Sequence, residues 1–234
     1  MIISIVLIIV VLFGGFAIYV NDYYKPDTSV EAYLSGNDKV NVISIKDGLF
    51  LDSNGEDKAL IFYPGAKVEY TSYLPMLMKI AEEGVDCFLV EMPFHLAFFG
   101  INQADSIMEQ YHYDHWYLSG HSLGGAMAAY YASSHLDILD GLALFAAYPT
   151  KDLKGEDFSV VSIYGSEDKV LNRKKLEEGK QYMPEHYSEV CIQGGNHSQF
   201  GNYGEQKGDG IATISRENQQ KTSIEAVLTM IQGN

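Results

Sequence analysis

The segment Gly-His-Ser-Leu-Gly at residues 120–124 constrains the fold of this chain more than any other. A short aromatic and aliphatic run at residues 116–119 predicts a buried strand before it, and an Ala-rich run predicts a helix after it. Glycines two residues either side of a serine let a strand turn sharply into a helix without a Cβ collision. We therefore predict that Ser122 occupies a strained strand-to-helix turn with its Oγ exposed.

A serine in such a turn becomes a nucleophile when a histidine accepts its proton. Two of the histidines after Ser122 are poor candidates. His135 lies near the end of the predicted helix, too far from its N-terminus to reach Ser122, and His186 lies in a polar connection and is expected to face solvent. His197 follows a predicted strand and a Gly-Gly turn, which is where open α/β sheets place their chemistry. We predict that His197 is the general base; the alternative is a loop histidine that only hydrogen-bonds its neighbours.

The carboxylate that would orient the histidine is predicted after the β-branched strand at residues 160–164. Gly165 opens a turn that presents Glu167 and Asp168. We favour Asp168, because the spacing strand-Gly-x-x-Asp carries the acid in many serine hydrolases, and Glu167 is the alternative. A solvated turn carboxylate would explain either residue without catalysis. The order Ser, Asp, His along the chain is that of the α/β-hydrolase arrangement.

An oxyanion hole is predicted from two backbone amides. The predicted strand at residues 59–63 ends in Pro-Gly-Ala-Lys at 64–67, and a glycine there lets the backbone approach a ligand. We expect the amide of Ala66 to be one donor, with the amide of Lys67 as the alternative, and the amide of Leu123 to be the other. An ordinary Pro-Gly turn is the competing interpretation.

With these residues the chain resembles the α/β-hydrolase superfamily over residues 40–234, and more narrowly a compact bacterial branch that is dienelactone-hydrolase-like in outline and poor in lid structure. The narrower resemblance rests on four segments, which are residues 63–68, 92–97, 120–128 and 195–201. The runs at residues 203–210 and 212–215 also resemble this branch. Dienelactone hydrolases proper usually carry a cysteine nucleophile, whereas this chain has Ser122. The resemblance therefore implies a serine hydrolase.

The whole chain alternates between predicted strands and helices, which argues for an α/β fold with a mostly parallel central sheet covered by helices on both faces. The strands are expected at residues 40–45, 59–63, 85–92, 115–119, 141–145, 160–164 and 189–193. The helices are expected at residues 72–83, 102–110, 123–134, 172–181 and 215–231. We expect one catalytic domain over residues 39–234, with too few residues between 148 and 159 for a substantial lid.

Residues 1–20 contain no charged side chain and are just long enough to cross a bilayer as a helix. We expect a single transmembrane helix that anchors the protein in a membrane, followed by a polar tether over residues 21–38. The alternatives are a signal peptide, cleaved to leave a secreted protein, and a buried core helix. The segment lacks a basic n-region and its apolar core is long for a signal peptide, so the anchor is favoured.

The charge of −15, from 31 acidic and 16 basic side chains, argues against a nucleic-acid partner. Cys87 and Cys191 both fall in predicted core strands, so we expect two small buried side chains and no disulfide. The seven histidines show no metal-binding spacing, and we predict neither a metal nor a cofactor. The oligomeric state is left open.

Several further side chains are expected near the substrate. They are Lys67, Met92, Phe94, Gln199 and Phe200. The apolar tail at residues 96–99 either packs under neighbouring loops or lines the pocket. His121 is expected to be structural.

Taken together, these patterns predict a hydrolase that cleaves a carboxylic ester or a related small acyl compound through an acyl-enzyme on Ser122. An acyltransferase or a thioesterase would use the same three side chains. A non-catalytic binding protein on a hydrolase fold is the alternative from another class.

Overall fold

The computed structural model describes residues 2–55 and 57–233, apart from the side chains of residues 2–10 and 13. Its centre is an eight-stranded sheet with the strand order β1-β2-β4-β3-β5-β6-β7-β8. The strands are β1 (Asn41–Ile45), β2 (Gly48–Asp52), β3 (Lys58–Tyr63), β4 (Asp86–Val90), β5 (His115–His121), β6 (Gly141–Phe145), β7 (Ser159–Gly165) and β8 (Tyr187–Ile192). All neighbouring pairs from β4 to β8 are parallel, whereas β2 runs antiparallel to both β1 and β4.

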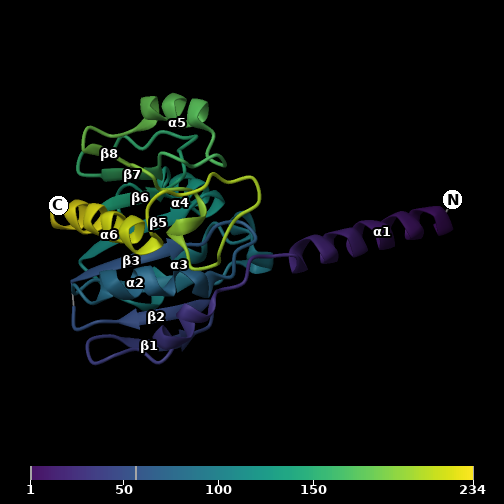
Figure 1. Cartoon of the computed structure of the whole chain (residues 1–234), viewed down its shortest axis with the longest axis horizontal. Coiled ribbons are helices and arrows are strands. Elements are labelled where there is room, and N and C mark those ends of the chain that lie inside the picture. Colours follow the sequence, from purple (N-terminus) through teal and green to yellow (C-terminus); the bar gives the residue numbers. More distant parts are fainter. Residues whose placement is uncertain (1, 56, 234) are drawn as a thin grey trace.

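Helices cover both faces of this sheet (Figure 1). Those on the faces are α2 (Leu74–Ala81), α3 (Gln103–Gln110), α4 (Leu123–Ala132) and α6 (Arg216–Gln232), whereas α5 (Arg173–Gly179) packs in a small separate cluster with Tyr164 and Leu171. Buried side chains of α2 and α6 share one core cluster with one face of β3 and β4, and those of α3 and α4 share a second cluster with the other face. The predicted α/β fold, with a mostly parallel sheet between two helical layers, is confirmed.

Two strands differ from expectation. Strand β2 was not anticipated, because its run of only five residues follows β1 after a tight turn and carries no alternation of its own. Strand β8 lies at the edge of the sheet, with most of its side chains outside the core. The expectation for the cysteines is therefore half wrong, because Cys87 is buried in β4 but Cys191 in β8 is exposed.

Helix α1 (Ile2–Asn21) projects away from the body in Figure 1. Among the side chains that the structure describes, no helix combines the length and apolarity that a bilayer span requires. The expected transmembrane anchor over residues 1–20 falls largely on residues 1–10 and 13, which lie outside those described side chains. The described part of the chain therefore gives this expectation no support.

The segment at residues 21–38, expected to be a polar tether, is folded onto the body instead. Tyr24 forms a β-bridge with Val68, and Val30 is buried in a 3₁₀ helix, η1 (Thr28–Tyr33). The carboxylate of Asp27 pairs with Arg216 of α6 at 2.5 Å. The polar composition of this segment predicted a solvated linker, but its backbone and side-chain polar groups form hydrogen bonds and an ion pair with the domain.

Candidate active site

Ser122 stands between β5 and α4 in the predicted strained turn, with φ 53° and ψ −120°. The turn requires the glycine two residues later, because a Cβ on Gly124 would lie 2.2 Å from the carbonyl oxygen of Tyr63. The amide of Ser122 donates to the carbonyl of Phe145 at 2.9 Å, which ties the turn to the neighbouring strand β6. The sharp turn leaves the serine at the N-terminus of α4, where the helix dipole favours negative charge.

Asp168 and His197 are brought together, although 29 residues separate them in the chain. The Nδ1 atom of His197 lies 2.8 Å from Oδ2 of Asp168, and both side chains are buried. The other carboxylate oxygen, Oδ1, accepts hydrogen bonds from the amides of Val170 and Leu171 at 2.8 Å each. These amides hold the carboxylate in one orientation, with Oδ2 aimed at the imidazole.

Glu167, the alternative acid, does not contact the imidazole. Its side chain is partly exposed and accepts a hydrogen bond from the Oγ of Ser166 at 3.0 Å. Its amide donates to the carbonyl of Gly195, so the backbone of this residue supports the histidine loop while its carboxylate points elsewhere. The geometry therefore favours Asp168 as the partner of the histidine.

The loop that carries His197 is held by two side chains that sequence reasoning did not identify. Gln219 of α6 accepts from the amide of Asn196 at 2.9 Å and donates to the carbonyl of the same residue at 2.8 Å. Asp209 accepts from the amide of Ser198 at 2.9 Å. Neither residue carries a local signal in the sequence, because its role depends on a contact with a distant loop.

His197 and Ser122 line one cavity of about 240 Å³. The Nε2 atom of His197 is buried and has no hydrogen-bond partner among the described residues, so the Oγ of Ser122 does not bond to it here. Catalytic hydrogen bonds are often long before substrate binds. With Nδ1 donating to Asp168, Nε2 is the nitrogen left to accept a proton.

The loop after β3 leaves one amide for an oxyanion. The amide of Gly65 donates to the hydroxyl of Tyr73 at 3.1 Å, and the amide of Lys67 donates to the carbonyl of His95 at 2.8 Å. The second bond removes Lys67, the alternative donor, from consideration. Since Pro64 has no N–H, the amide of Ala66 is the candidate that remains from this loop.

Tyr73 links this loop to the residue before the nucleophile. Its buried hydroxyl accepts from the amide of Gly65 and shares a second hydrogen bond, of 2.8 Å, with Nδ1 of His121. Burial, with a smaller contribution from nearby His197, holds the pKa of His121 well below its usual value, so the ring is neutral. The expected structural role of His121 fits this arrangement.

We predict that Tyr73→Phe lowers kcat about tenfold or more while KM changes little. Without the hydroxyl, the buried amide of Gly65 loses its acceptor, and the adjacent amide of Ala66 loses its fixed direction. Steady-state kinetics on a soluble ester would measure both constants. The matched control is Tyr203→Phe, which removes another buried hydroxyl, bonded to Gln206. Equal kinetic effects of the two variants would contradict a positioning role for Tyr73.

The side chains around the cavity are mostly small and apolar. Besides Ser122 and His197 they belong to Leu123, Ala126, Ala146, Ala147, Tyr148, Val170, Leu171 and Asn172. Most of these residues follow the carboxyl ends of β6 and β7. The sequence did not predict that these residues line the cavity, because alanine and valine after a strand occur both in cavity walls and in the packed core.

None of the five side chains expected near substrate lines this cavity. Phe200 is fully buried, and the side-chain amide of Gln199 donates to the carbonyl of Ile214. Met92 is buried in the core, Phe94 is exposed beside other aromatic rings, and the ammonium of Lys67 pairs with Asp22 at 2.9 Å. These residues do follow strands, as predicted, but their side chains do not line the cavity beside Ser122.

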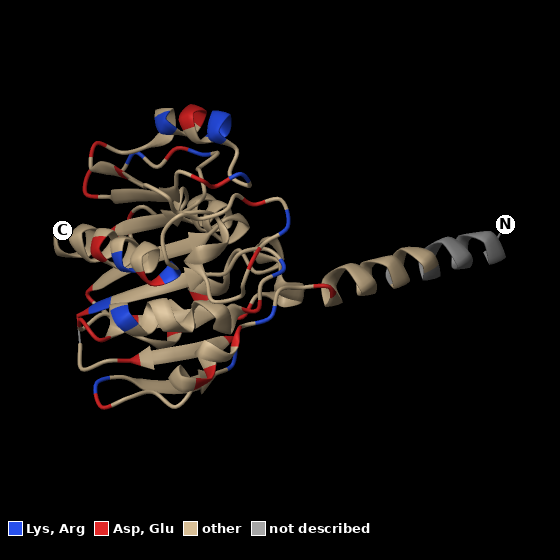
Figure 2. Cartoon of the chain, in the orientation of Figure 1, with Lys and Arg blue, Asp and Glu red and all other residues tan. Residues whose placement is uncertain are grey.

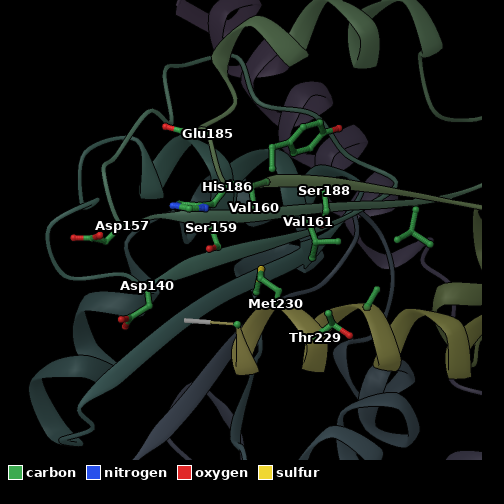
Figure 3. A pocket seen from close by; sticks show the side chains of 14 residues that line it. Asp140, Asp157, Ser159, Val160, Val161, Glu185, His186, Ser188, Thr229 and Met230 are labelled. Carbon is green, nitrogen blue, oxygen red and sulfur yellow. The ribbon is translucent and has the colours of Figure 1, made fainter.

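A larger cavity, of about 820 Å³, lies at the opposite end of the sheet (Figure 3). Asp140, Ser159 and Tyr187 line it at the amino ends of β6, β7 and β8. Open α/β sheets bind ligands at the carboxyl ends of their strands, so we place the active site at the smaller cavity. Among the described residues, no group of three or more His, Cys, Asp or Glu side chains could hold a metal ion.

Comparison with known proteins agrees with this fold. The model of the alpha/beta hydrolase family matches residues 59–221, well over half of the chain. A comparison with curated proteins finds none that matches in sequence. Among solved structures, Est1E from Butyrivibrio proteoclasticus is similar with a TM-score of 0.58 and 13% identity, over 83% of this chain and 99% of that one. Alpha/beta hydrolase domain-containing protein 10 from mouse is similar with a TM-score of 0.60 and 10% identity, over 83% and 99%.

Proposed function

This chain belongs to the alpha/beta hydrolase family, and on that premise we propose that it is a serine hydrolase that cleaves a carboxylic ester or a related acyl compound. The observation that carries the proposal is the buried pair of His197 and Asp168, at 2.8 Å, beside a serine in a strained turn. A protein that only binds ligands on this fold has no need of a buried, oriented imidazole with one free nitrogen.

In the proposed mechanism, the Oγ of Ser122 attacks the acyl carbonyl while Nε2 of His197 takes its proton. Asp168 keeps the imidazole in the productive tautomer and stabilises its cation. The amides of Ala66 and Leu123 donate to the oxyanion. The imidazolium then protonates the leaving group, and water repeats the sequence on the acyl-enzyme. No step needs a cofactor.

The proposed substrate is a small acyl compound with a neutral, apolar acyl group. The cavity beside Ser122, at about 240 Å³, is smaller than the roughly 300–1,000 Å³ typical of ligand pockets. Among the residues that the structure describes, no Lys, Arg, Asp or Glu side chain lines it. A charged acyl group would lose its hydration there without gaining a partner.

We predict that acetyl and butyryl esters are cleaved at least about tenfold faster, in kcat/KM, than decanoyl esters, because most of a long chain would lie outside so small a cavity. Rates on a series of nitrophenyl esters would measure this. Tyr148→Ala, at the cavity wall, should shift the preference toward longer chains, whereas Tyr130→Ala, on an exposed tyrosine outside the cavity, should not. A decanoyl preference in the unmodified protein would overturn this assignment.

Covalent labelling tests the hydrolase proposal itself. A fluorophosphonate probe should label the full-length protein on Ser122, and peptide mass spectrometry would identify the residue. Failure to label, together with no turnover on any ester or thioester, would favour a binding protein.

A further inference from the structure

Four exposed phenylalanine side chains form one cluster at the base of α1, which we call the aromatic patch. Phe94, Phe98 and Phe99 come from the segment after β4, and Phe16 comes from α1; they are 52%, 46%, 47% and 37% exposed. Ring centroids lie 5.4 Å apart for Phe94 and Phe99, 4.2 Å for Phe98 and Phe99, and 5.4 Å for Phe16 and Phe94. Contiguous exposed apolar surface of this kind usually marks an interaction site.

The backbone that presents the patch is strained. Phe94 and His95 have φ values of 58° and 56°, in the left-handed region, which a bulky residue such as phenylalanine rarely adopts. The segment is held there by the hydrogen bond from Lys67 to the carbonyl of His95 and by the ring of Tyr23, stacked on His95 at 4.0 Å. A positive φ at Phe94 costs conformational energy. The protein keeps this backbone conformation although it leaves about half of the ring exposed to solvent.

The segment that carries the patch has no Asp, Glu, Lys or Arg side chain of its own, although Glu69 lies near His95 and Glu91. Residues 92–101 and residues 1–20 contain no Asp, Glu, Lys or Arg, although the chain carries a charge of −15. In Figure 2 the ribbon positions of charged residues are spread over the body, and the described part of α1 has none. At the base of the patch, Lys67 and Asp22 neutralise each other in an ion pair. The exposed rings themselves therefore offer a partner apolar surface and no charge.

We propose that the aromatic patch docks the protein on a neutral lipid surface, with the phenyl rings inserted at the level of the headgroups. Aromatic side chains gain from burial at such an interface, and the adjacent uncharged α1 continues the same apolar surface. The negative charge of the body disfavours an anionic lipid surface, so zwitterionic lipid is the predicted partner.

The docked orientation turns the active site toward the lipid. The patch follows β4, the oxyanion loop follows β3 and Ser122 follows β5, and these three strands are parallel neighbours. Their carboxyl ends meet at one edge of the sheet. In addition, the 3₁₀ helix η4 (Ala97–Phe99) packs against α4, the helix that starts after Ser122. This consequence rests on the proposed function; the docking itself does not.

The decisive test places a fluorescent reporter in the patch of the full-length protein. Trp116, the single tryptophan, is buried, so a Phe98→Trp variant adds one exposed indole. With phosphatidylcholine vesicles we expect a blue shift of its emission, and strong quenching when the lipid chains are brominated. Ile138→Trp, at a site 46% exposed and far from the patch, is the control and should show neither effect. Absence of quenching in Phe98→Trp would overturn the proposal, even if the protein bound vesicles through α1.

A second measurement uses the partition coefficient on the same vesicles. Phe98→Ala with Phe99→Ala should weaken binding about tenfold or more, whereas Ile43→Ala with Ile138→Ala, at similarly exposed positions, should not. Turnover on a soluble ester should be unchanged in both double variants, so loss of docking is distinguishable from loss of the proposed hydrolysis. Dimerisation without lipid that depends on Phe98 and Phe99 would show that a second copy covers the patch, and would also overturn the proposal.

Discussion

Ser122→Ala is expected to reduce ester hydrolysis roughly 10³- to 10⁶-fold and to abolish fluorophosphonate labelling, with the fold intact. The Oγ atom is the only group in the proposed cycle that bonds covalently to the acyl carbon. Alanine removes this atom. The fold should stay intact, because serine already adopts the positive φ here and alanine, like serine, is unbranched at Cβ. Turnover of purified protein, with a circular dichroism spectrum to verify folding, measures the effect.

Ser133→Ala provides the matched control. This serine lies just after α4, and its hydroxyl donates only to the carbonyl of Tyr130. It should keep wild-type activity and labelling. If Ser122→Ala also keeps wild-type turnover, Ser122 is not the nucleophile, and the mechanism proposed here fails with it.

Asp168→Asn is expected to lower kcat about 10⁴-fold. An amide can still accept the backbone bonds from Val170 and Leu171, but its NH₂ group would then face Nδ1 of His197. The imidazole would turn to the tautomer that carries its proton on Nε2, where it cannot accept one from Ser122. The buried site would also lose the charge that stabilises the imidazolium.

Glu167→Gln changes the neighbouring carboxylate in the same way and serves as the comparison. Because Glu167 meets Ser166 instead of the imidazole, its loss should cost less than about threefold. Both variants are measured on one ester under the same conditions. A larger loss in Glu167→Gln than in Asp168→Asn would assign the acid to Glu167.

Much of the fold and part of the candidate site were predictable, because their signals are local. Apolar runs bounded by turn residues located β5, β6 and β7, and the Ala-rich run after Ser122 located α4. The glycine pattern predicted the positive φ of Ser122, since only small neighbours allow that turn. His197 and Asp168 were chosen by their places after strands, and the structure brings their side chains together.

Other parts of the site depend on contacts that no local pattern records. Tyr73 and Gln219 hold the loop after β3 and the loop that carries His197 from distant elements, and each resembles an ordinary helix residue in the sequence. The same limit explains why Phe200 and Gln199 were expected near substrate. In the residues just after His197, the direction of a side chain depends on how the loop packs. Phe200 packs into the core, whereas Gln199 is half-buried and bonds to the carbonyl of Ile214.

The sequence by itself therefore determined the class of fold, the strained turn at Ser122 and the order of the residues that follow, because backbone sterics and hydrophobic periodicity act over a few residues. Only the tertiary structure decided between Asp168 and Glu167 as the partner of His197. It also determined that the amide of Lys67 donates to the carbonyl of His95, and that residues 24–33 pack onto the body. These choices depend on which donors and acceptors meet once distant strands pair, and burial makes each unpaired group costly enough to select one arrangement.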